Sequence, residues 1–354
     1  MPPFLGFLIR RLIAIPITLF IVTVALYAIL MLAPPEVRAA VYLPDRLPPH
    51  VDPEVVIQRI IRDRGLADPF PVQYGRWLGR LLRGDWGYSP LLNGPILESL
   101  LARTPATAEL AIYASLLFIP LGLISGGIAA ARPNRPADNA FRLVAFLGTS
   151  VPPFVLGLWL LALFYVAFHW FPPMRLGIPQ SQIVQSSDFT AFTGLLTIDG
   201  LLNRRPEITL DALRHLVLPV ATLAFSHWAT LGRLTRASMV EESERPYITA
   251  ARARGIPARR IVWRHAFRNA MVPALNSTAL SAASLVTGVF VVEVVFGFHG
   301  ISELITNALT GNPDVYLAVG FAVFSVVLVL PIMLILDIVQ AIVDPRIREG
   351  VALE

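Results

Sequence analysis

Apolar stretches of the length needed to cross a lipid bilayer recur along this chain and constrain its fold more than any other feature. A helix needs about 20 apolar residues to cross the hydrocarbon core. Five charge-free stretches of that kind are clear, and a sixth, shorter one contains His227 and can be extended by helix-forming residues. The six stretches are residues 12–33, 110–131, 143–174, 216–232, 270–292 and 316–336. The sequence therefore predicts an all-α polytopic membrane protein with six transmembrane helices.

The composition agrees with a membrane protein and argues against several other classes. The 354 residues are 55% hydrophobic and only 15% charged, which is unusual for a soluble domain. There is no cysteine, so neither a disulfide framework nor thiolate metal ligation can form. His169, His227 and His299 lack metal-ligand spacing, so we predict no metal site. The net charge of +5 comes from arginines between apolar stretches, which favours a role in membrane orientation over nucleic-acid binding.

The arginine distribution predicts which side of the membrane each segment occupies. If the N-terminus is cytosolic, the inside segments hold 16 arginines and 7 acidic residues, and the outside segments hold 13 and 16. This follows the positive-inside rule, so we expect both termini in the cytosol. Arg10 and Arg11 before the first stretch also fit a signal peptide. The stretch is longer than the 7–15 residues typical of one, so we expect a retained helix.

The predicted spans divide the chain into three parts. Residues 1–33 form the cytosolic N-terminus and first helix, 34–109 an external subdomain between helices 1 and 2, and 110–354 the transmembrane core. The core includes a long cytosolic loop at 233–269.

Within residues 34–109, helices are predicted at 53–64 and 72–83. An apolar face there favours a packed subdomain over a solvated connector. It comprises Trp77, Leu78, Leu81, Leu82 and Trp86. A second external segment, 175–215, shows no clear periodicity, and its role stays open.

Prolines and carboxylates in or beside the spans are candidate pathway residues. Pro152 and Pro153 should bend or break the third span, either to line a translocation pathway or as a kink packed against neighbouring helices. Ionisable groups beside spans are functional candidates because hydrocarbon does not solvate them. Glu109 and Glu293 stand at external span ends. They could line a vestibule or neutralise Arg103, or be satisfied by water alone.

The arginine-rich loop at 233–269 predicts two short helices. Pro246 suits the first position of one helix, and Gly255 suits its left-handed end. Pro257 can then open the second helix. Tyr247, Ile248 and Ala251 should share an apolar face of the first helix that could dock in a groove of another protein. The alternative is a solvated loop whose arginines only set the membrane orientation.

The first of these helices, YITAARARG, resembles the Glu-Ala-Ala loop of ABC importer permeases. The closest match is the oligopeptide, dipeptide and nickel family, and within it the first, B-type permease subunit. Thr249, Ala250 and Ala251 stand where the motif has Glu-Ala-Ala, and Gly255 keeps its place. The missing glutamate points to the peptide branch. Further matching segments occur in family order: FLIRRL, QYGRWLGRLLRGDWGYS, RTPATAELA, SVPPFVLG, HLVLP, GRLTRASM, VVEVVFGFHGI and DPRI.

The resemblance implies the fold of a type I ABC importer permease and a coupling helix that sits in a cleft of an ATPase subunit. The coupling residues would be Tyr247, Ile248, Thr249, Ala250, Ala251, Arg252, Ala253, Arg254 and Gly255. The sequence has no phosphate-binding G-x-x-x-x-G-K-[ST] motif and no H-E-x-x-H or G-x-S-x-G motif. We therefore expect no catalytic residue and no cofactor on this chain, with ATP and Mg²⁺ bound by partner subunits.

The resemblance also implies the partners and the cargo. We expect a homologous second permease in a heterodimer, two ATPase subunits and an external solute-binding protein, in a bacterial or archaeal cytoplasmic membrane. The implied function is import of short peptides. Nickel chelates or oligosaccharides are the alternatives for the same machinery. An ion-gradient transporter that needs no ATPase is the alternative from another class.

Overall fold

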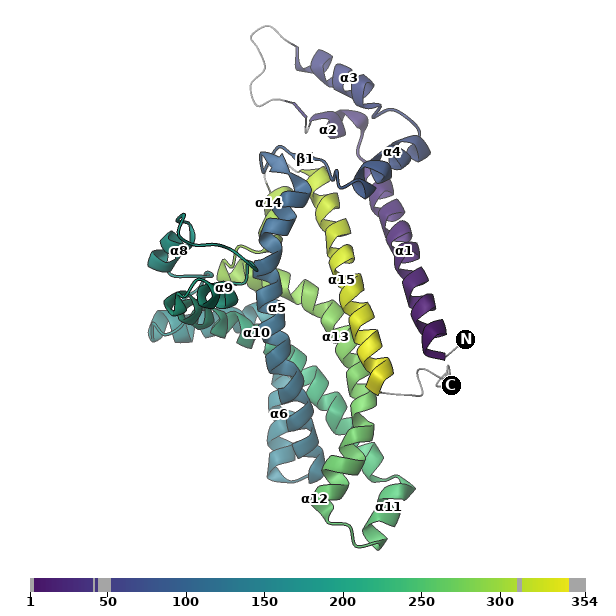
Figure 1. Ribbon diagram of the computed structural model, residues 1–354, viewed down its shortest axis with the longest axis vertical. Helices are drawn as coiled ribbons and strands as arrows, with labels where there is room; N and C mark the ends of the chain where they lie inside the picture. The colour runs from purple at the N-terminus through teal and green to yellow at the C-terminus, as the bar shows by residue number, and fades with distance from the viewer. Residues whose placement is uncertain (1–2, 41, 44–51, 311–313, 344–354) are drawn as a thin grey trace. The chain divides into compact units, whose positions relative to one another are not determined.

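The computed structural model describes residues 3–40, 42–43, 52–310 and 314–343, and the described chain is almost entirely helical (Figure 1). It separates into two compact units. The larger consists mainly of Pro105–Ser302, and the smaller of Ile9–Thr104 with Glu303–Leu330. The DPRI segment at 344–347 lies outside the described residues. The predicted division of the chain at residues 33 and 109 stays a prediction.

The smaller unit joins the first and last long helices to the segment that follows the first span. Its elements are α1 (Pro3–Leu30), α2 (Pro35–Ala40), α3 (Pro53–Arg64), α4 (Phe70–Leu82), a two-stranded ribbon of β1 (Tyr88–Ser89) and β2 (Gly94–Pro95), the start of α5 (Ile96–Ala131), most of α14 (Ile301–Leu309) and the first half of α15 (Val315–Val343). The predicted helix at 53–64 is confirmed. It begins where Asp52 caps the amide of Glu54 and ends at Gly65, whose φ is +58°.

The apolar face predicted on the second of these helices is largely buried. Tyr74 and Trp77 of α4 pack in one hydrophobic cluster with Tyr27 of α1 and with Val319 and Val323 of α15. Leu78, Leu81 and Trp86 join this cluster. Leu82 does not: it is 79% exposed, so its assignment to the packed face was wrong. It is the last residue of α4, where the helix ends and its side chain turns outward.

The larger unit is built around α10 (Pro206–Ser243), which packs against α5 and against α13 (Phe267–Phe296). The predicted stretch 216–232 lies within α10, so its extension by helix-forming residues is confirmed. Glycines allow the helices to approach closely, because a Cβ at Gly126 of α5 would overlap the carbonyl oxygen of Gly232 in α10. Such close contacts of small residues stabilise helix pairs in membranes.

The third predicted span is broken instead of being one kinked helix from 143 to 174. α6 (Pro136–Ser150) and the pair α7 (Pro153–Leu160) with the π-helical η1 (Leu161–Ala167) meet at an angle of 104°. Pro152 and Pro153 have no N–H to continue the ladder from α6, so the chain leaves the helix there and a new helix begins at Pro153. Residues 168–174 are not helical.

Counted by length and composition, four described helices can cross a membrane, or up to six if each of two bent pairs is one span. The bent pairs are α6 with α7–η1, and the end of α13 with α14. The expectation of an all-α polytopic membrane protein is confirmed. The segment 175–215, whose role the sequence left open, folds with α8 (Ile178–Val184) and α9 (Leu196–Leu202) over its own small core. That core consists of Leu176, Phe189, Leu196, Ile208 and Ala212.

The arginine-rich loop contains only one separate short helix, α11 (Pro246–Ala253). The second predicted helix is wrong as an independent element. α12 (Ala258–Arg260) continues through the π-helical η2 (Ile261–Ala266) directly into α13. A wider π-turn keeps the chain helical there, so no break separates the loop from the membrane helix.

Candidate functional site

α11 has well-defined ends that set it apart from the long helices. Pro246 occupies its first turn, where the missing N–H costs no helical hydrogen bond. At its other end the amide of Gly255 donates to the carbonyl of Arg252 (2.9 Å), and Ile256 donates to Ala251 (3.2 Å). Gly255 has a φ of +73°, and a Cβ there would meet nothing within 4 Å. The glycine is therefore required for the left-handed backbone of this cap and not for space.

The inner face of α11 packs against its own chain. Ile248 is fully buried and Ala251 is 7% exposed. Both lie in one cluster with residues of α5, α10, η2 and α13, namely Ala130, Met239, Ile261, Ala266 and Ala270. The prediction that Ile248 and Ala251 belong to a face for docking in another protein is wrong, because both side chains already pack against the rest of this chain.

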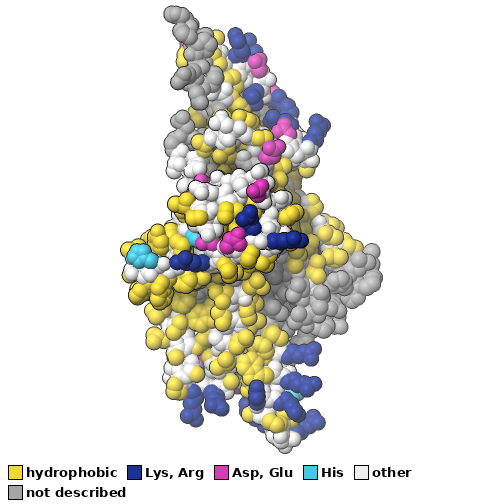
Figure 2. Space-filling view, turned by 60° about the vertical axis from the view of Figure 1, so that its left-hand side comes forward, with side chains coloured by type: hydrophobic (Ala, Val, Ile, Leu, Met, Phe, Trp, Pro, Cys, Tyr) yellow, Lys and Arg dark blue, Asp and Glu magenta, His cyan; other side chains and the backbone are white. Residues whose placement is uncertain are grey.

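The outer face of α11 is exposed. It comprises Thr249, Ala250, Arg252, Ala253 and Arg254. Figure 2 shows arginine side chains gathered at the end of the view where Figure 1 places α11 and α12. This outer face has small residues at its centre and arginines beside them. It is the part of α11 that is open to a partner.

Tyr247 attaches the start of α11 to both neighbouring long helices. Its hydroxyl donates to Oε2 of Glu242 in α10 (2.6 Å) and accepts from Nδ2 of Asn269 in α13 (2.9 Å). Burial raises the pKa of the Tyr247 phenol, and the hydrogen bond to Glu242 acts in the same direction. The phenol therefore stays protonated and keeps its donor, so Tyr247 links the start of α11 to both α10 and α13.

Glu109 is buried and fully bonded instead of lining a vestibule. Its side chain is 1% exposed. Arg175 donates to its Oε2 from Nη2 (2.8 Å) and Nε (3.2 Å). The amide and hydroxyl of Thr197 donate to its Oε1 at 2.8 and 2.7 Å. Its cationic partner is Arg175 and not Arg103. Glu109 instead fastens the 175–215 segment to α5, and Arg103 pairs with Glu303 (2.8 Å).

Glu293 is equally enclosed, at the turn between α13 and α14. It is 2% exposed, accepts from the hydroxyl of Thr107, and accepts at Oε2 from the amide of Ser302 (3.0 Å). Thr107 in turn accepts from the amide of Ile301 (3.0 Å). Glu293 is thus too buried to line an open vestibule, and this carboxylate organises the 84° turn after α13.

Sequence reasoning missed the partners of both carboxylates. One signal was available for Glu109: Arg175 is the first charged residue after the third apolar stretch, at the same predicted external surface. A carboxylate buried at a span end needs such a counter-charge. Thr107 and Thr197 carried no comparable signal. The candidate pathway residues Pro152 and Pro153 form the bend after α6, and their contribution to a pathway stays a prediction.

We expect Gly300→Ala to lower the stability of this turn. A Cβ at Gly300 would overlap the carboxylate of Glu293, so the carboxylate must move away from Ser302. Overpacking of this kind costs about 1–3 kcal/mol. Thermal unfolding of the purified protein measures the change. Gly79→Ala in α4 is the matched control, since its Cβ meets nothing within 4 Å. An unchanged unfolding temperature for Gly300→Ala would contradict the role given to Glu293.

Within the described residues, no group of three or more histidine and acidic side chains could hold a metal ion. The geometry therefore presents a helical membrane protein with a short, two-faced helix at its arginine-rich end. The buried carboxylates of Glu109 and Glu293 hold neighbouring segments of the chain in place.

Comparison with known proteins agrees with this geometry. Residues 119–349 match the family described as binding-protein-dependent transport system inner membrane component. The chain belongs to this family, and it is a transport permease subunit and not an enzyme. The predicted resemblance to peptide ABC permeases is confirmed.

Several characterised relatives are similar over most of their length. The probable D,D-dipeptide transport system permease protein DdpB of Escherichia coli is 33% identical over 297 residues, which cover 84% of this chain and 86% of that protein. The di/tripeptide transport system permease protein DppB of Pseudomonas aeruginosa is 31% identical, with 97% and 99% covered. The oligopeptide transport system permease protein AppB of Bacillus subtilis is 32% identical, also with 97% and 99% covered.

Proposed function

We propose that this chain is the membrane-spanning subunit of an ATP-driven importer that moves short peptides into the cell. The observation that carries the proposal is similarity along nearly the whole chain to permease proteins of dipeptide and oligopeptide transport systems. The family description supports delivery of the cargo by a binding protein. The arginine balance supports cytosolic termini in a bacterial or archaeal cytoplasmic membrane.

The proposed machine contains a homologous second permease, two ATPase subunits that bind ATP and Mg²⁺, and an external solute-binding protein. α11 is the coupling helix. Its inner face, with Ile248 and Ala251, is anchored to the permease, and its outer face, centred on Ala250 and Ala253, contacts the ATPase subunit. Closure of the ATPase subunits would move α11. That motion would reach α10 and α13 through the hydrophobic cluster and through Tyr247.

Reconstitution tests this function directly. The chain is coexpressed with the proteins encoded beside it, purified as a complex and placed in proteoliposomes, and uptake of labelled di- and tripeptides is measured. We expect uptake only when ATP, the ATPase subunits and the binding protein are all present. Uptake of nickel chelates or oligosaccharides in place of peptides would refute the cargo. Transport driven by an ion gradient without the ATPase would refute the class.

A further inference from the structure

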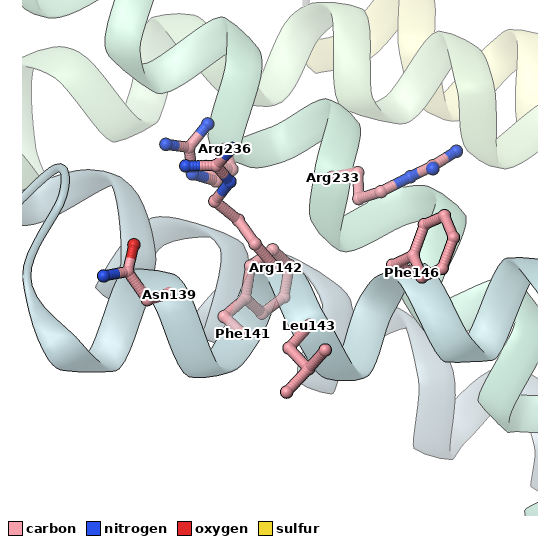
Figure 3. A pocket seen from close by; sticks show the side chains of 7 residues that line it. All are labelled: Asn139, Phe141, Arg142, Leu143, Phe146, Arg233 and Arg236. Carbon is pink, nitrogen blue, oxygen red and sulfur yellow. The ribbon is translucent and has the colours of Figure 1, made fainter.

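A pocket of about 620 Å³ opens between α6 and α10 in the larger unit. Its lining side chains come from these two helices (Figure 3). They are Asn139, Phe141, Arg142, Leu143 and Phe146, and Arg233 and Arg236. The pocket therefore combines three guanidinium groups with three apolar side chains on a single surface.

One of the three arginines is already neutralised. Arg236 forms an ion pair with the fully buried Asp138. Nη2 of Arg236 lies 2.8 Å from Oδ2 of Asp138. Arg142 and Arg233 are exposed at the same pocket, and Arg233 donates only to the hydroxyl of Thr149 (3.3 Å) among the described hydrogen bonds. Two positive charges are thus left without an acidic side chain among the pocket residues. A bound anion would compensate them.

The positions of these arginines place the pocket at the membrane surface. Arg142 comes directly before the charge-free stretch 143–174, and Arg233 comes directly after the stretch 216–232. Both charges therefore mark the depth at which hydrocarbon gives way to headgroups. Leu143 and Phe146 are 63% and 61% exposed on the same helix, as expected for side chains that face lipid.

We propose that this pocket binds the headgroup phosphate of an anionic phospholipid in the leaflet on the arginine-rich side. Arg233 contacts the phosphate, Arg142, whose side chain lies beside Arg236 (Figure 3), adds positive charge at the same pocket, and Leu143 and Phe146 contact the first methylenes of an acyl chain. Guanidinium groups suit phosphate oxygens because their N–H donors lie in a plane. Basic pockets between membrane helices recognise anionic lipid headgroups on this physical basis. A free phosphate ion would leave the apolar part of the lining unused. The proposal is independent of the transported cargo.

Lipid titration followed by native mass spectrometry tests the proposal. The full chain, in the complex with which it purifies, is titrated in detergent with phosphatidylglycerol, with phosphatidylcholine, or with inorganic phosphate. The double variant Arg142→Gln/Arg233→Gln should lose roughly thirtyfold in affinity for phosphatidylglycerol, because each arginine near an anionic surface contributes about 1 kcal/mol. Its affinity for phosphatidylcholine, which has the same phosphate but no net charge, should be weak in the parent protein and fall much less.

The matched control is Arg132→Gln/Arg135→Gln, which removes two exposed arginines from the connection between α5 and α6, outside the pocket. It should keep the affinity of the parent protein. Arg142→Lys/Arg233→Lys keeps both charges and should restore most of the affinity. If the control and the pocket variants lost the same affinity for phosphatidylglycerol, the proposal of a specific lipid site would be wrong. Competition by inorganic phosphate at the same concentration as the lipid would assign a free anion. Crosslinking of Arg142→Cys to another subunit, with no lipid bound, would assign a protein partner.

Discussion

Ala250→Arg should abolish substrate-stimulated ATP hydrolysis while leaving the permease folded and inserted in the membrane. Ala250 is exposed at the centre of the outer face of α11, where only a small side chain allows close approach of a partner. A long charged side chain would hold the ATPase subunit away from the helix. Losses at the centre of an interface commonly reach 2 kcal/mol or more, so we expect a decrease of about thirtyfold. ATPase activity of the reconstituted complex, with and without peptide-loaded binding protein, measures it.

Ala251→Arg is the matched contrast, because it makes the same chemical change one residue further along the helix. Ala251 is 7% exposed and packs in the cluster that holds α11 on the permease. An unpaired charge there costs on the order of 3–5 kcal/mol, so this variant should lose stability and yield before coupling can be measured. Ala191→Arg, exposed in the 175–215 segment, controls for the added arginine. If Ala251→Arg folded normally and Ala250→Arg kept full stimulation, the assignment of the two faces would be reversed.

Glu109→Leu should destabilise the larger unit by about 3–5 kcal/mol, because it leaves Arg175 with an uncompensated charge and the Thr197 amide without an acceptor. The 175–215 segment should open first, since Glu109 links it to α5. Thermal unfolding gives the total loss, and hydrogen–deuterium exchange of peptides that cover 195–203 locates it. The stability of Glu109→Gln should lie between those of the parent protein and Glu109→Leu. The glutamine amide oxygen can still accept from Thr197, but the negative charge that pairs with Arg175 is gone.

The double variant Glu109→Leu/Arg175→Met separates loss of a charge pair from loss of a single partner. Removing both charges should recover much of the stability, because the penalty comes mainly from the charge left behind. Glu207→Leu is the surface control: Glu207 lies 3.7 Å from Arg205 and is half exposed, so its removal should cost about 0.5 kcal/mol or less. A loss for Glu109→Leu no larger than for Glu207→Leu would show that the buried pair contributes little.

Elements with strong local signals could be predicted from the sequence. The helix at 53–64 begins after a capping aspartate and a proline and ends at a glycine, and the structure gives the same bounds. The left-handed end of α11 at Gly255 follows from the same chemistry. The long apolar stretches depend on no partner, because water excludes them wherever they occur.

Elements whose state depends on distant residues could not be predicted in this way. The apolar side chains of α11 indicated a buried face, but their pattern cannot distinguish a partner protein from the rest of the same chain. The second loop helix joined α13 because no residue interrupts the helical ladder between Ala258 and Phe267. The bend at Pro152 was expected, and its angle of 104° depends on the packing of α6 along α10.

By itself, the sequence determined that this chain is a helical membrane protein, which family it resembles and where the short helix α11 begins and ends. These properties rest on hydrophobicity and on backbone rules that act over a few residues. The tertiary structure alone decided that Ile248 and Ala251 face inward, that Glu109 pairs with Arg175 and that Glu293 is enclosed by its own turn. Such pairings and their supporting hydrogen bonds join residues up to 194 positions apart. Only the folded chain brings them within hydrogen-bonding distance.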